Sequence, residues 1–323
     1  MTRGSKQYVL NIIPGYPHYM MSVDFCGFSL DNPIVLASGI LGVTKNSIKN
    51  IANQGAGAVT IKSISFEERK GHNNPIIITY EGGMMNAVGY SNPGLEEAKT
   101  EFSNLKEVGV PVFGSIVGND AKEFGKIARY FLSNEFSAVE LPLSCPHTPG
   151  FGVMAGQNTP EATYDITKAV KKETDLPIIV KLSPISQNIG DIAKAAEEAG
   201  ASAINMGNTH GPGMAINIET REPVLDFKIG GVSGPAIKPI TVRSVYDLYQ
   251  TINIPIIGTG GIINARDAIE IMMAGATLVG VGSAIYYEGI DVFSNMCDGI
   301  RDFMEKEGYK SVKELIGAAH GKF

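Results

Sequence analysis

The chain has 323 residues, of which 44% are hydrophobic and 19% charged, and its formal net charge is −6. We expect one large globular core, because no apolar run approaches the ~18 residues that a membrane-spanning helix needs. The basic residues are dispersed along the chain, which argues against a nucleic-acid partner.

The N-terminal residues 1–21 are expected to form an extension before a single domain at 22–323. Arg3 and Lys6 are not followed by the apolar segment and cleavage site of a secretory signal, so export is not expected. The three cysteines form no C-x-x-C pair, which excludes a disulfide framework or a cysteine-ligated iron–sulfur cluster within this chain. We therefore expect a cytoplasmic protein that holds no metal.

Apolar, β-branched strand segments alternate with segments of helical periodicity along the whole domain. Strands are expected at 33–37, 58–64, 111–117, 138–143, 177–182, 203–206, 255–258 and 277–281. Helices are expected at 44–54, 95–108, 121–133, 160–174, 189–199, 241–252, 265–274 and 289–307. Eight such pairs predict an α/β fold of the (β/α)8 TIM barrel type, with a closed parallel sheet.

Glycine is concentrated after the last two expected strands, at Gly258-Thr259-Gly260-Gly261 and Gly280-Val281-Gly282-Ser283. In (β/α)8 barrels this is where phosphate groups commonly bind. Three long connections, at 65–94, 146–159 and 209–240, also follow strands. They should therefore gather over the C-terminal mouth of the barrel, where active sites lie.

Polar side chains stand at the ends of the apolar strands and should converge if the barrel closes. They are Ser38, Lys62, Ser63, Cys145, Lys181, Ser183, Asn208 and Thr209. Two strand-end lysines, Lys62 and Lys181, predict a mouth that binds an anionic or electron-rich ligand.

Cys145 is the strongest candidate for a reactive group. It follows an apolar strand in the run Ser144-Cys145-Pro146-His147 and opens a loop rich in glycine and proline. Cys26 and Cys297 lack such a setting, and we expect them to serve as small packing residues.

An ordered series of motifs runs between about residues 22 and 287. It comprises residues 32–39, Lys62-Ser63-Ile64, Arg69-Lys70-Gly71, residues 86–94, Ser144-Cys145-Pro146, residues 180–184, Asn208-Thr209, residues 230–239 and residues 258–262. This series resembles the class 1 dihydroorotate dehydrogenases, and class 1B most closely. The resemblance implies an FMN-dependent oxidoreductase that converts dihydroorotate to orotate in pyrimidine biosynthesis. It also implies a homodimer, or a heterotetramer with an electron-transfer subunit that carries FAD and a [2Fe–2S] cluster.

The resemblance assigns roles to individual residues. Cys145 would be the general base at C5 of the substrate, while hydride passes from C6 to flavin N5. Lys62 would be a catalytic residue that faces both flavin and substrate, and Lys181 would stabilise the reduced flavin. The substrate would be bound by Lys62, Asn86, Gly89, His147, Asn208 and Thr209. FMN would be bound by Ala37, Ser38, Gly39, Lys62, Ser63, Lys181, Asn208, Gly234, Gly260, Gly261, Gly282 and Ser283.

Two positions depart from the family pattern. Pro142 and His147 occupy positions where the family has asparagines that donate hydrogen bonds to the substrate, and proline has no side-chain donor. The cysteine loop is also similar to the flavin domain of dihydropyrimidine dehydrogenases, so a dihydrouracil-like substrate is an alternative. The electron acceptor remains open between NAD through a partner subunit, fumarate and a quinone. A non-redox phosphate-binding lyase or isomerase and a flavin-dependent RNA dihydrouridine synthase are more distant alternatives.

Overall fold

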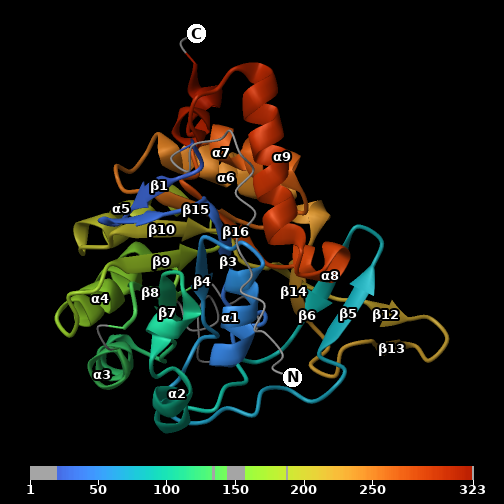
Figure 1. The fold of residues 1–323 in the computed structure, drawn as a ribbon. Coiled ribbons are helices and arrows are strands. Elements are labelled where there is room, and N and C mark those ends of the chain that lie inside the picture. Colours follow the sequence, from blue (N-terminus) through green and yellow to red (C-terminus); the bar gives the residue numbers. More distant parts are fainter. Residues whose placement is uncertain (1–19, 133–134, 144–156, 187, 322–323) are drawn as a thin grey trace, which may run out of the picture.

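The computed structural model describes residues 20–132, 135–143, 157–186 and 188–321. Its centre is a closed parallel barrel of eight strands (Figure 1), which confirms the predicted fold class. In spatial order the strands are β10 (Ala203–Met206), β15 (Ile256–Thr259), β16 (Leu278–Val281), β3 (Ile34–Leu36), β4 (Ala58–Thr60), β7 (Val112–Ser115), β8 (Ala138–Pro142) and β9 (Ile178–Leu182).

The barrel strands are buried along their full length, which explains why they appear in the sequence as continuous apolar runs. The connecting helices are α1 (Lys45–Asn53), α2 (Leu95–Glu101), α3 (Ala121–Phe131), α4 (Pro160–Lys171), α5 (Ile189–Glu198), α6 (Lys238–Tyr249), α7 (Ala265–Met273) and α9 (Val292–Glu307). Side-chain caps define several helix starts. In α7, Asn264 accepts from the backbone N–H of Asp267, whose carboxylate accepts from the N–H of Asn264 in return.

The structure differs from the predicted elements in several places, most clearly around three helices. The segment 95–108 is not one helix, because α2 is followed by Asn104 in a left-handed conformation (φ 55°) and then by a 3₁₀ turn, η2 (Leu105–Val108). Helix α6 begins at Lys238, before the predicted residue 241, and follows the turn η4 (Pro235–Ile237). A short helix that was not predicted, α8 (Ala284–Glu288), precedes α9.

Two of the long connections form a second sheet beside the barrel. Strands β5 (Ile77–Tyr80) and β6 (Gly83–Asn86) come from the connection after β4, and β11 (His210–Gly213) and β14 (Gly230–Ser233) come from the connection after β10. They pair in the order β11-β14-β6-β5, and Figure 1 shows this sheet extending from one side of the barrel. The small hairpin of β12 (Ile216–Asn217) and β13 (Glu222–Pro223) extends the same region.

The remaining described elements pack around the barrel. The antiparallel hairpin of β1 (Val23–Phe25) and β2 (Phe28–Leu30) packs Phe25 and Phe28 against Phe113 of β7, with ring centroids about 6 Å apart. Two 3₁₀ turns, η5 (Val312–Leu315) and η6 (Ala318–His320), end the described chain. None of the helices within the described ranges is long and apolar enough to cross a membrane.

Candidate active site

A cavity of about 280 Å³ lies at the carboxyl ends of the barrel strands, between them and the antiparallel sheet. Because parallel strands end at the same mouth, residues far apart in the chain meet there. Fourteen of the predicted site residues line it: Ala37, Ser38, Gly39, Lys62, Ser63, Asn86, Gly89, Lys181, Asn208, Thr209, Gly260, Gly261, Gly282 and Ser283.

Three predicted site residues remain. Cys145 and His147 lie outside the described residues. Gly234 precedes η4 with φ 99°, and a Cβ there would lie 2.9 Å from Cα of Gly83, so its close approach is to β6. Its neighbours Ser233 and Ile237 line the cavity in its place.

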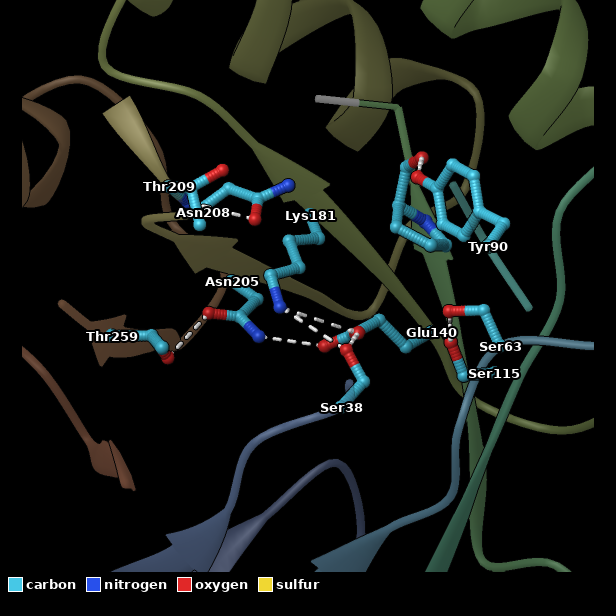
Figure 2. A network of polar contacts seen from close by, with 11 residues as sticks. Ser38, Ser63, Tyr90, Ser115, Glu140, Lys181, Asn205, Asn208, Thr209 and Thr259 are labelled. Atoms are coloured by element: carbon cyan, nitrogen blue, oxygen red, sulfur yellow. Dashed lines mark hydrogen bonds and ion pairs between the residues drawn. The ribbon is translucent and has the colours of Figure 1, made fainter. Parts of the chain in front are cut away.

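A polar network (Figure 2) includes three residues that line the cavity, Ser38, Lys181 and Thr259. Ser38 Oγ donates to Oε1 of Glu140, and Nδ2 of Asn205 donates to Oε2 at 2.6 Å. Nζ of Lys181 lies 3.1 Å from Ser38 Oγ and 3.7 Å from Glu140 Oε1. Thr259 Oγ1 completes the chain of contacts by donating to Asn205 Oδ1 at 2.8 Å. The network joins residues from five barrel strands or the positions just after them, and it holds the Lys181 ammonium group at the cavity.

Lys62 provides a second cation at the same cavity. Its backbone N–H donates to the carbonyl of Gly42 at 2.8 Å, which holds the segment after β4 in place. Burial lowers the pKa of the Lys62 side chain below its ordinary value, because desolvation disfavours the charged form. Beside it, the buried hydroxyls of Ser63 and Ser115 are 2.8 Å apart. An anionic ligand that paired with Lys62 would offset the free-energy cost of burying its charged form.

The antiparallel sheet supplies the other wall of the cavity. Asn86 lies at the end of β6, and Asn208 accepts a hydrogen bond from the backbone N–H of Thr209 at 2.8 Å. Tyr90 adopts φ 56°, which is uncommon for a residue other than glycine, and its hydroxyl donates to the carbonyl of Pro142 at 3.5 Å. Asn86, Tyr90 and Asn208 all line the cavity, so amide and phenol groups border any ligand there.

The comparisons with known proteins agree with each other. A family model described as dihydroorotate dehydrogenase matches residues 20–304. The chain belongs to the dihydroorotate dehydrogenase family. It is therefore an oxidoreductase of pyrimidine biosynthesis, and its described cavity is the candidate active site.

Among the relatives is a protein of Methanocaldococcus jannaschii named dihydroorotate dehydrogenase B (NAD(+)), catalytic subunit. It is 43% identical over 305 residues, which cover 93% of this chain and 98% of the relative. A relative of the same name from Methanocella arvoryzae is 45% identical over 294 residues, covering 91% of this chain and 96% of the relative. These names support the expected resemblance to class 1B.

A solved structure of dihydroorotate dehydrogenase from Eimeria tenella, in complex with ferulenol, has a similar fold. The TM-score is 0.80 with 21% sequence identity, and the match covers 97% of this chain and 91% of that one. At this identity the likeness supports the (β/α)8 barrel alone.

Sequence reasoning did not select several residues that the site of this dehydrogenase contains. They are Tyr90, Ser115, Glu140, Asn205 and Thr259. A signal for two of them was present: Glu140 and Asn205 are polar residues inside otherwise apolar barrel strands, where a side chain is buried and needs partners. Tyr90 carried no comparable signal, because only the packing of its loop against β8 brings it to the cavity.

The two described cysteines lie apart from this site. Cys26 is half-buried, with its thiol 3.5 Å from the carbonyl of Ser202, and Cys297 is buried on α9. Burial raises the pKa of both thiols to about 12, which suppresses the reactive thiolate. This agrees with the packing role expected for them.

Proposed function

We propose that this chain is the FMN-bearing catalytic subunit of a dihydroorotate dehydrogenase, which oxidises dihydroorotate to orotate. The observation that carries the proposal is the meeting of Lys62 and Lys181 with the amides Asn86 and Asn208 around one cavity. Cations complement the substrate carboxylate and the electron-rich flavin, while amides can both donate to and accept from a pyrimidine ring.

The residues around the cavity fit a flavin with a phosphate tail. A Cβ added at Gly39 would meet no atom within 4 Å, and one at Gly282 would meet only Ala37 Cβ at 3.9 Å, so the backbone there borders open space. Ile40, Met84 and Val88 add apolar surface for a flat ring. Gly260, Gly261, Gly282 and Ser283 follow the last two barrel strands and would offer their backbone N–H groups to the phosphate.

The residues around the cavity would have different roles in the reaction. Lys62 and Asn86 would bind and orient the substrate carboxylate and ring, and Lys181 would hold positive charge beside the flavin. When bound, FMN supplies the acceptor for the hydride that leaves C6. Cys145 would accept the proton that leaves C5.

A related dihydropyrimidine, such as dihydrouracil, is a second candidate substrate. Pro142 ends β8 at the cavity, and it has no side chain that could donate to a substrate carboxylate or carbonyl. His147 follows closely in the sequence and offers an imidazole in place of an amide. These two residues support testing the smaller substrate, which lacks the carboxylate.

Anaerobic single-turnover flavin reduction distinguishes these substrates. The purified chain, loaded with FMN, is mixed with dihydroorotate or with dihydrouracil, and the flavin absorbance is followed. We expect dihydroorotate to bleach the flavin and dihydrouracil to do so far more slowly. If dihydrouracil bleaches the flavin and dihydroorotate does not, dihydrouracil is the better candidate substrate. A chain that takes up no flavin would refute both and favour a non-redox phosphate-binding barrel.

We further propose that electrons leave through a second subunit that carries FAD and a [2Fe–2S] cluster, in a cytoplasmic homodimer or heterotetramer. The printed names of the relatives, which specify NAD and a catalytic subunit, support this assignment. In the described part of the chain no group of three or more His, Cys, Asp or Glu side chains could hold a metal. The barrel from residue 22 onward would act as one domain, and residues 1–21 as an extension.

A further inference from the structure

Glu140 is a buried charge that the proposed reaction does not use. It lies in the middle of strand β8 and is 2% exposed, and it is not among the residues that line the cavity. Burying a carboxylate inside a barrel costs several kcal/mol unless other groups compensate it. Its presence in an otherwise apolar strand therefore calls for an explanation.

The contacts of Glu140 are those of an ionised carboxylate. Both oxygens accept a hydrogen bond, one from Ser38 and one from Asn205, and the ammonium of Lys181 lies 3.7 Å away. Figure 2 shows the carboxylate between these three side chains. Hydrogen bonds from Ser38, just after β3, and Asn205 of β10, together with the cation of Lys181 on β9, thus keep a negative charge in one position.

Lys181 separates this charge from the cavity. The lysine lines the cavity and is 5% exposed, while Glu140 lies behind it. A ligand in the cavity therefore meets the positive end of an ion pair and, farther away, the negative end. In a poorly solvated site the distant charge is not screened, so it offsets part of the attraction that the lysine exerts on an anion.

We propose that Glu140 is a positioning and charge-balancing residue that lowers the reduction potential of the flavin held against Lys181. This inference rests on the proposed function. Reduction of the flavin by dihydroorotate transfers two electrons and one proton as hydride from C6, while the C5 proton goes to the base. The reduced ring then carries negative charge whenever N1 stays unprotonated. Lys181 favours that charge, and Glu140 opposes it.

Glu140→Gln tests the inference, because it keeps the size of the side chain and removes its charge. The reduction potential of the bound flavin is measured by anaerobic titration against a reference dye, with dithionite as the reductant. We expect the equilibrium constant for reduction to rise at least tenfold, which corresponds to about 30 mV for a two-electron couple. Lys181→Met should shift the potential in the opposite direction.

Two controls separate charge from packing. Glu140→Asp keeps the carboxylate and should change the equilibrium constant less than threefold. Glu173→Gln removes the same formal charge from an exposed ion pair with Arg129 on the helical layer and should leave the potential unchanged. If Glu140→Gln fails to fold, the double variant Glu140→Gln/Lys181→Met replaces it and is compared with Lys181→Met alone. The double variant should then have the higher potential.

Each outcome decides the inference. An unchanged potential in Glu140→Gln would reduce Glu140 to a structural role. A lower reduction potential in Glu140→Gln would show that Glu140 acts only by keeping Lys181 charged. That result would also contradict the proposed charge-balancing role. Failure of the unmodified chain to bind flavin would instead count against the proposed function, and this is measured first.

Discussion

At the scale of single residues, burial and charge determine what each side chain at the cavity can do. The lowered pKa of Lys62 is the clearest case, because the group is cationic only over a narrower pH range than an ordinary lysine. Its charged form would bind the carboxylate of dihydroorotate or orotate. Ligand binding should therefore depend on the protonation of Lys62.

We expect the dissociation constant of orotate to rise with pH, beginning below the ordinary lysine pKa of 10.5. The sign follows because the protonated lysine binds the anion, and raising the pH removes that proton. The measurement is a titration of the flavin spectrum with orotate across the pH range. In Lys62→Met the affinity should be lower at pH values where Lys62 is protonated, and the difference from the unmodified protein should shrink as Lys62 loses its proton. Any pH dependence of the dissociation constant that remains in Lys62→Met is assigned to groups other than Lys62. The same pH dependence in both proteins would contradict the prediction.

Tyr90 is a second residue whose role only the structure suggests. Its hydroxyl is 3.5 Å from the carbonyl of Pro142, at the end of a strand that offers no side-chain donor. We expect this hydroxyl to turn from the Pro142 carbonyl to the bound substrate. Tyr90→Phe should then raise KM for dihydroorotate about three- to tenfold with a smaller change in kcat, as expected for one lost hydrogen bond. Steady-state kinetics measure both constants.

A second-site substitution makes the Tyr90 prediction specific. Adding Pro142→Asn to Tyr90→Phe should restore part of the lost affinity by supplying an amide donor from β8. Tyr130→Phe, at an exposed tyrosine on α3, should leave both constants unchanged. An unaltered KM in Tyr90→Phe would exclude the hydroxyl from substrate binding.

At the scale of elements, the site lies where the barrel strands end, and close backbone packing keeps these strand ends together. Gly207 follows β10 with φ 126°, and a Cβ there would lie 1.5 Å from the carbonyl oxygen of Thr259. The site residues Asn208 and Thr209 come directly after it. The β10 and β15 ends can therefore approach only because this position is glycine.

Gly207→Ala should lower the free energy of unfolding by at least about 3 kcal/mol, the sum of a positive-φ penalty and overpacking. Gly125→Ala provides the matched control. Gly125 lies inside α3, where an added Cβ would make ordinary contact at 3.4 Å, and alanine should be neutral or stabilising by up to about 1 kcal/mol. Urea unfolding followed by circular dichroism compares the two, and similar midpoints would disprove the argument.

Not every element was predictable from periodicity. The barrel strands and most helices were, because burial on both strand faces and on one helix face leaves a regular apolar pattern. The split between α2 and η2 was not, since the left-handed Asn104 interrupts the helix within an apolar repeat. The pairing of β6 with β14 could not be predicted either, because it joins residues far apart in the sequence, such as Met85 and Val232.

At the scale of the whole molecule, the question is how electrons leave the reduced flavin. If a second subunit takes them, the chain alone should be reduced once by dihydroorotate but should not reduce NAD. Turnover with NAD should appear when a copurified subunit carrying FAD and a [2Fe–2S] cluster is added. Rapid turnover of the isolated chain with fumarate would contradict this prediction.

The sequence by itself determined the barrel, the strand-end lysines and glycines, and the family motifs. These features are local, since they depend on periodicity and on the order of residue types along the chain. Only the tertiary structure decided which of these side chains share one cavity. It also showed that Glu140, Asn205 and Tyr90 belong to the site, because their partners Lys181, Thr259 and Pro142 lie tens of residues away in the chain. Barrel closure is what brings such distant strand ends together.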